Sequence, residues 1–290
     1  MSAGLDRRWI YLLVFLALAW PIVQRYSLPP AKMNSAGRMF DVMDTLKFGP
    51  GDIAFIAMDY GPNTIAENKP QSEVTIEHLM RRRIPFALYS QYVQADPFLK
   101  SVPEGIAEKL MKEDPTQSWA YGKDWVNFGY RPGGTLFIQS IPKAENILEH
   151  LKEDAFGTAL KDIPCLKDFK SFKNVKLLGQ FTGLTGTFEA FVQFFQTEDY
   201  RPTFVHGCTS ITVPEAYIYL DSGQIVGLLE GIAGAAWYSK LLSDRFVKRA
   251  PDDALIINTS LGIAHLVLIG LIFLGNVVGL VKARERGVPG

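Results

Sequence analysis

Residues 51–90 read GDIAFIAMDYGPNTIAENKPQSEVTIEHLMRRRIPFALYS and predict the architecture of the central part of the chain. Two short apolar runs, 53–58 and 84–88, are typical of strands buried on both faces of a parallel sheet. Residues 59–63 hold turn-forming side chains, and 71–83 place apolar side chains at helical spacing. Two buried strands joined by a helix predict one right-handed crossover unit.

The alternation of strand and helix continues after this unit. Further strands are predicted at 124–130, 175–181 and 203–208, and glycine-bearing loops lead from them into predicted helices at 135–141, 187–196 and 214–220. This repetition resembles that of doubly wound α/β domains, with about four to five parallel strands. We therefore predict a doubly wound, mostly parallel, Rossmann-like α/β domain over residues 28–250. The resemblance is at the level of the fold only, and a fold does not imply a function.

Both ends of the chain are apolar. Residues 255–281 contain no charged side chain and are long enough for a transmembrane helix, which needs roughly 20 apolar residues. Residues 9–23 are shorter and resemble the apolar region of a signal peptide, but the small-residue cleavage pattern is poor. We therefore favour an uncleaved signal anchor over residues 1–27, with a cleaved signal peptide as the alternative, and a C-terminal transmembrane helix with a basic tail over residues 251–290.

Basic residues near the two apolar segments predict an orientation. Arg7 and Arg8 precede the first segment, and a basic tail follows the second, with Lys282, Arg284 and Arg286. By the positive-inside rule both termini are then cytoplasmic and the α/β domain is extracytoplasmic. Five basic residues argue against this orientation, because they lie on the domain side of the two segments: Arg25, Lys32, Arg245, Lys248 and Arg249. In an oxidising compartment Cys165 and Cys208 could form one disulfide.

Composition and motifs exclude several classes of function. Lys and Arg number 30, Asp and Glu number 30, and the resulting net charge of +0 argues against a nucleic-acid partner. The first strand is not followed by GxGxxG, and the chain contains neither GxxxxGK[ST] nor HExxH. The four histidines are scattered along the sequence. The sequence therefore predicts no nucleotide cofactor and no metal site.

The candidate ligand-binding residues follow the predicted strands. Ligands of open parallel sheets bind beyond the carboxyl ends of the strands. This rule selects Asn63, Thr64, Arg131, Gly133, Gly134 and Thr182. Arg131-Pro132-Gly133-Gly134 before a helix could bind phosphate or carboxylate through backbone N–H groups and a guanidinium, or it could form a tight glycine turn.

Four residues are weak catalytic candidates. Asp59 and Glu67, in the loop after the first strand, could act as general acid and base, or they could be solvated loop acids. His206 and Cys208 are two residues apart and share one face of a strand, so that they could form an activated nucleophile. The alternative is a packed histidine beside a buried or disulfide-bonded cysteine.

Small residues at regular spacing predict sites of close helix packing. Residues 222–242 are predicted to form one helix, in which small residues recur every four positions on one face: Gly223, Gly227, Gly231 and Ala235. Such a face allows close approach of another backbone. This face could pack against the sheet or against a second subunit, or the helix could dip into the membrane. Gly275 and Gly279 form a GxxxG pair in the C-terminal apolar segment.

Two classes of function remain. We favour a membrane-anchored binding or structural subunit of a larger membrane assembly, whose partners are the lipid bilayer and either other proteins or further copies of the chain. The alternative is a membrane-bound hydrolase or transferase that acts on an envelope substrate. An enzyme would require at least two of five polar side chains to converge in one cleft: Asp59, Glu67, Arg131, His206 and Cys208. A transport or secretion accessory would need partners, because two spans form no pathway alone.

Overall fold

A computed structural model describes residues 7–285, with side chains described as far as Val281. The chain forms two compact units. One is the central domain, residues 31–250, and the other combines the two ends of the chain, up to Pro30 and from Pro251.

A parallel sheet forms the centre of the domain. Its strands are β1 (Ile53–Asp59), β2 (Phe86–Ser90), β3 (Trp125–Tyr130), β4 (Val175–Thr182), β5 (Thr203–Cys208) and β6 (Gly227–Glu230). They lie in the order β3-β2-β1-β4-β5-β6, and all neighbouring strands are parallel. Every residue of β1 and β2 is buried, as their continuous apolar runs predict. The doubly wound α/β fold is therefore confirmed, with one strand more than predicted.

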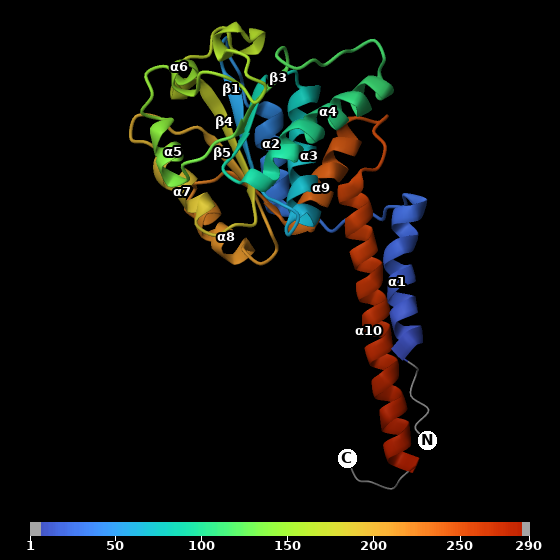
Figure 1. Cartoon of the computed structure of the whole chain (residues 1–290). Helices are drawn as coiled ribbons and strands as arrows, with labels where there is room; N and C mark the ends of the chain where they lie inside the picture. The colour runs from blue at the N-terminus through green and yellow to red at the C-terminus, as the bar shows by residue number, and fades with distance from the viewer. Residues whose placement is uncertain (1–6, 286–290) are drawn as a thin grey trace. The chain divides into compact units, whose positions relative to one another are not determined.

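Helices cover both faces of the sheet (Figure 1). One face carries α2 (Asn34–Thr45), α3 (Ile65–Arg81), α4 (Asp96–Glu113) and α9 (Gly231–Arg245). The other carries α5 (Thr135–Ser140), α6 (Ile147–Leu151), α7 (Thr187–Phe195) and α8 (Val213–Asp221). Short 3₁₀ turns occupy Val93–Ala95, Leu160–Asp162, Pro164–Leu166 and Phe172–Asn174.

The single helix predicted over residues 222–242 is wrong. The segment contains a turn at Gly223, strand β6 from Gly227, and helix α9 from Gly231, so Gly223, Gly227, Gly231 and Ala235 do not share one helical face. Pairing with β5 overrides the helical spacing, because glycine is a poor helix former. Of the three glycines, only Gly227 lies directly against the backbone of another element. A Cβ at Gly227 would lie 2.6 Å from Met39 Cα in α2.

The free edge of β3 is covered by the chain itself. Ala155 N–H donates to the Asn127 carbonyl over 2.8 Å, and Asn127 N–H donates to the Tyr121 hydroxyl over 3.2 Å. Gly129 N–H donates to the Asn127 side-chain oxygen over 2.8 Å. The other edge strand, β6, has only four residues. A covered edge and a short edge both discourage the addition of a foreign strand.

A buried ion cluster links the C-terminal end of the domain to α3. Arg249 binds Glu77 in α3 through two hydrogen bonds, Nε to Oε1 over 2.7 Å and Nη2 to Oε2 over 2.9 Å. Arg81 and Lys109 also pair with Glu77. Burial alone would raise the pKa of Glu77, but these positive charges, led by Arg249, lower it to about 2. The carboxylate therefore stays ionised inside the domain.

The second unit is a helical hairpin. Helix α1 (Arg7–Gln24) packs against α10 (Asp253–Glu285) (Figure 1). The hairpin is closed by an ion pair between Arg25 and Asp253 over 3.6 Å and by a hydrogen bond from Leu28 N–H to the Thr259 hydroxyl over 2.9 Å. Both helices are long and apolar enough to cross a membrane, and most of their surface is exposed, unlike that of helices in a protein core.

Candidate functional site

The order of the strands places a topological switch point between β1 and β4, where ligands of this fold bind. Asp59 ends β1 at this point and is buried. Its carboxylate accepts hydrogen bonds from Ser90 Oγ (3.0 Å), Gln91 N (2.8 Å) and Gln180 Nε2 (3.2 Å). Burial raises the pKa of the Asp59 carboxyl, while the three hydrogen bonds act in the opposite direction. Asp59 thus joins three strands and offers no free oxygen to a ligand.

Side chains of the domain fill the space above the switch point. A Cβ at Gly183 would lie 2.5 Å from Thr64 Cγ2 and 2.7 Å from Thr209 Cγ2. The Thr182 hydroxyl donates to the Asp59 carbonyl over 2.9 Å and accepts from Leu184 N–H. Thr64 and Thr182, two of the predicted ligand-binding residues, therefore close the switch point by packing and by hydrogen bonds.

The start of α3 is likewise occupied by contacts within the domain. Gln71 Nε2 lies within hydrogen-bond distance of three carbonyl oxygens, those of Cys208 (2.8 Å), Leu229 (3.0 Å) and Gly231 (2.9 Å). Glu67 accepts from both the backbone N–H and the hydroxyl of Ser210. Glu67, predicted as an acid or base, instead fixes the loop after β5.

Arg131 contacts backbone carbonyls rather than an anion site. Its Nη1 donates to the Leu151 carbonyl over 3.3 Å and its Nη2 donates to the Glu153 carbonyl. The glycine turn after it has positive φ angles at Gly133 and Gly134 and leads into the six-residue α5. Of the two interpretations of this sequence, the geometry matches the tight turn. Asn63 is exposed in the loop after β1.

His206 and Cys208 are both buried at the end of β5. Burial lowers the pKa of His206 to about 3 and raises the pKa of the Cys208 thiol to about 12. An activated nucleophile requires the opposite shifts, a thiolate beside an imidazolium. These pKa directions run against the Cys–His nucleophile, which stays a prediction. Cys165 and Cys208 are both free thiols, so the possible disulfide is absent.

The polar candidates do not converge on a single cleft. Over the part of the chain that the structure describes, no hydrogen bond joins any two of the five side chains that an enzyme was expected to combine. The cavity that His206 lines and the one that Arg131 lines include none of the other four. The same residues contain no group of three or more His, Cys, Asp or Glu arranged to hold a metal ion.

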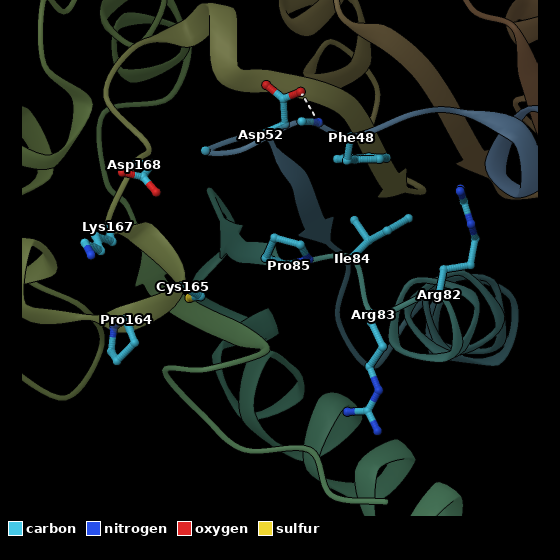
Figure 2. Close-up of a pocket in the computed structure, with 12 residues that line it drawn as sticks. Phe48, Asp52, Arg82, Arg83, Ile84, Pro85, Pro164, Cys165, Lys167 and Asp168 are labelled. Atoms are coloured by element: carbon cyan, nitrogen blue, oxygen red, sulfur yellow. Dashed lines mark hydrogen bonds between the residues drawn. The ribbon is translucent and has the colours of Figure 1, made fainter.

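A cavity of about 350 Å³ lies at the opposite, amino-terminal edge of the sheet (Figure 2). Figure 2 shows Lys167 and Asp168 on one side and Arg82 and Arg83 on the other. Arg82 donates to the Met43 and Leu46 carbonyls, and Arg83 donates to the Ser118 carbonyl and the Gln117 side chain. Both guanidinium groups are thus held by the domain. The cavity lies at the edge away from the one where this fold binds ligands.

A second, smaller cavity of about 20 Å³ lies at the carboxyl edge, beyond β4 and β5 and between α7 and α8. Its lining includes Thr182, Phe188, Glu189, His206, Thr212 and Glu215. It thus combines two residues predicted from the sequence, Thr182 and His206, with two acids that the prediction missed. Glu189 and Glu215 are each the third residue of the helix after a strand, α7 after β4 and α8 after β5. Since β4 and β5 are neighbours, this shared position was a signal that could have identified them.

Comparison with protein-family models gave no match, and comparisons with curated proteins and with solved structures gave none either.

Proposed function

We propose that the protein is a membrane-anchored α/β domain that acts as a binding or structural subunit of a larger membrane assembly. The observation that carries this proposal is an exposed face of α10 with the spacing of a helix–helix seam. The closed switch point is consistent with it, because the usual ligand crevice of this fold is filled by the chain itself.

The α10 seam consists of His265, Leu268, Ile272, Gly275 and Gly279, which follow one another at alternating steps of three and four residues. This spacing places them on one side of a helix. All five are exposed, and a Cβ at either glycine would meet no atom within 4 Å. Glycines at such positions allow a second helix to approach closely.

Polar groups strengthen the argument for a partner. Asn276 adjoins Gly275 on the same side of α10, and it is exposed, as is His265. A polar side chain in hydrocarbon without a hydrogen-bond partner is costly, so such groups usually face other helices. The proposal therefore places a second helix, from another protein or from a second copy of this chain, against the α10 seam.

The proposed location follows from the two apolar helices. We place α1 and α10 across the membrane, with the termini in the cytoplasm and the domain outside it, on the distribution of Arg7, Arg8 and the basic tail. Labelling with a membrane-impermeant thiol reagent tests this placement, using single cysteines introduced at exposed positions of a cysteine-free chain. An S101C label in intact cells is expected, and labelling only after lysis would contradict it.

The assembly is tested by native mass spectrometry of the full chain extracted in a mild detergent. We expect a defined oligomer or co-purifying proteins, and we expect Gly275→Leu and Gly279→Leu to remove them. Gly270→Leu is the matched control, since Gly270 is equally open but lies on another side of α10. A monomer without companions, or equal effects of all three variants, would contradict the proposal.

The second candidate is a membrane-bound hydrolase or transferase acting on an envelope substrate. The observation that favours it is the pair of carboxyl groups of Glu189 and Glu215 beside a neutral histidine, because paired acids can divide general acid and base roles. For this candidate, Glu215→Gln would reduce turnover of an envelope extract by about 100-fold or more and leave the assembly intact. Unchanged turnover would exclude this role for Glu215.

A further inference from the structure

The small cavity between α7 and α8 presents an unusual set of hydrogen-bond acceptors. His206 Nδ1 lies 3.0 Å from the Gln180 carbonyl oxygen, and since a carbonyl only accepts, Nδ1 carries the hydrogen. The ring is neutral at physiological pH because burial lowers the pKa of His206 to about 3. Its Nε2 therefore holds a lone pair, and no described residue donates to it.

The two acids of the cavity have no positive partner. Neither Glu189 nor Glu215 forms an ion pair with a described basic side chain, and Glu189 Oε2 is buried without a hydrogen-bond partner. A hydrogen bond to Glu189 and the negative charge there raise the pKa of the Glu215 carboxyl. Two carboxyl groups and one imidazole ring thus line a space of about 20 Å³.

We propose that this cavity binds the ammonium group of a primary amine, whose three N–H donors are accepted by Glu189, Glu215 and His206 Nε2. R–NH₃⁺ has three N–H donors, one for each of these three acceptor groups. The volume holds a group of about the size of one water molecule, which suits an ammonium nitrogen. The site lies outside the α10 seam, and the inference does not depend on the proposed assembly.

A metal ion fits these residues less well. The described side chains contain no group of three His, Cys, Asp or Glu arranged for metal coordination. Ammonium hydrogen bonds span about 2.8 Å between heavy atoms, whereas small divalent cations require ligands at about 2.1 Å. Aromatic rings also suit an organic cation. Phe188 stacks on His206 with ring centroids 4.0 Å apart and meets Tyr219 edge-on at 4.9 Å.

The rest of the amine would occupy an adjoining open groove of about 480 Å³, which shares Glu189 with the cavity. The groove is lined by polar side chains that include Gln193, Gln224 and Arg201. Arg201 donates through Nε to the Thr197 carbonyl over 3.4 Å, and its Nη groups have no partner among the described residues. A zwitterion with its ammonium at Glu215 and an anionic group at Arg201 therefore matches the groove.

The test is calorimetric titration of the full chain in detergent at pH 7.5. Methylammonium has two non-hydrogen atoms, so its Kd is expected on the order of 10 mM. Tetramethylammonium has the same charge without N–H donors, and it is expected to bind at least tenfold more weakly. Glu215→Gln should weaken methylammonium binding about tenfold or more. The exposed Glu198→Gln is the matched control, and it should change nothing.

Two further probes distinguish the source of the amine. O-phosphoethanolamine should bind more tightly than methylammonium, and Arg201→Gln should remove that gain. Nα-acetyl-lysine amide, which lacks the anionic group, would bind as tightly as O-phosphoethanolamine if the natural ligand were a lysine side chain of a partner protein.

Several results would overturn the inference. Tetramethylammonium that binds as tightly as methylammonium would overturn it, and so would an unchanged Kd for methylammonium in Glu215→Gln. Mg²⁺ that excludes methylammonium until a chelator is added would do the same. So would the absence of methylammonium binding up to about 100 mM, ten times the expected Kd. Glu215 is exposed in α8, so its glutamine variant is expected to fold, and its thermal unfolding checks this. None of these results bears on the α10 seam, whose test is the mass of the assembly.

Discussion

Replacing Glu77 with glutamine should destabilise the central domain by about 3 kcal/mol. Glu77 is 2% exposed, and Arg249 binds both of its oxygens. Its pKa is lowered from 4.5 to about 2. A difference of one pKa unit between the folded and unfolded states corresponds to about 1.4 kcal/mol. The ionised carboxylate therefore contributes about 3 kcal/mol to the free energy of unfolding. Loss of one partner from a buried ion pair has a similar cost, about 3–5 kcal/mol, since the remaining charge is left buried.

The assay is urea unfolding of the full chain in detergent, followed by tryptophan fluorescence. Glu108→Gln is the control, because Glu108 pairs with Lys112 over 4.0 Å on the exposed side of α4 and its loss should cost about 1 kcal/mol or less. The double variant Glu77→Met with Arg249→Met should lose less than the two single variants together, since neither charge is left unpaired. A loss below about 1 kcal/mol for Glu77→Gln, or strict additivity in the double variant, would show that the Glu77–Arg249 pair does not stabilise the domain in this way.

The same carboxylate predicts a pH dependence. A folded-state pKa below the unfolded value means that the unfolded chain binds the proton first as pH falls. The stabilisation from Glu77 is therefore fully present above pH 4.5 and is lost as pH falls through about 2. In the Glu77→Gln variant, the free energy of unfolding should lack this loss at acid pH. If the variant lost the same free energy as pH falls, the loss would come from other carboxylates.

Three further perturbations have defined outcomes. Gln71→Met should cost about 2–4 kcal/mol in urea unfolding, because it leaves buried carbonyls at the ends of β5 and β6 unpaired; a cost below 1 kcal/mol would count against this role. Burial lowers the pKa of His78 to about 4 and of His206 to about 3, so stability should be complete above pH 6.5 and decline as pH falls through these values; a melting temperature constant from pH 7.5 to 4.5 would contradict this. Gly227→Ala should destabilise the domain by about 1–3 kcal/mol, because the added Cβ meets the α2 backbone. Gly105→Ala, in open space on α4, should stabilise the domain slightly. Equal melting temperatures of the two variants would contradict this difference.

Short apolar runs and the alternation of strand and helix made most of the sheet predictable. The strands predicted at 53–58, 175–181 and 203–208 lie in β1, β4 and β5 almost residue for residue. The segment 53–58 is wholly apolar, since a strand covered on both faces needs no polar alternation. Strand β6 was missed because it has four residues and its one glycine, Gly227, falls at the spacing of a helix face. Its identity depends on pairing with β5, a tertiary contact that local sequence does not contain.

The site was predictable at the level of the sheet edge but not of individual residues. The correct edge follows from the fold, and Thr182 and His206 do line a cavity there. Asp59, Glu67 and Arg131 carry the right chemistry at that edge, yet hydrogen bonds to distant segments occupy them. Such partners lie up to 143 residues away in sequence, so spacing alone cannot reveal which polar groups are free.

The protected edges of the sheet limit how the protein can associate. Because loop 153–159 seals β3 at Asn127 and β6 offers only four residues, neither side of the sheet is a template on which a further chain can polymerise. Association is left to helix faces, loops and the apolar hairpin. Where such a contact is two-fold symmetric, it closes at a fixed stoichiometry, and such a finite complex can be counted by mass.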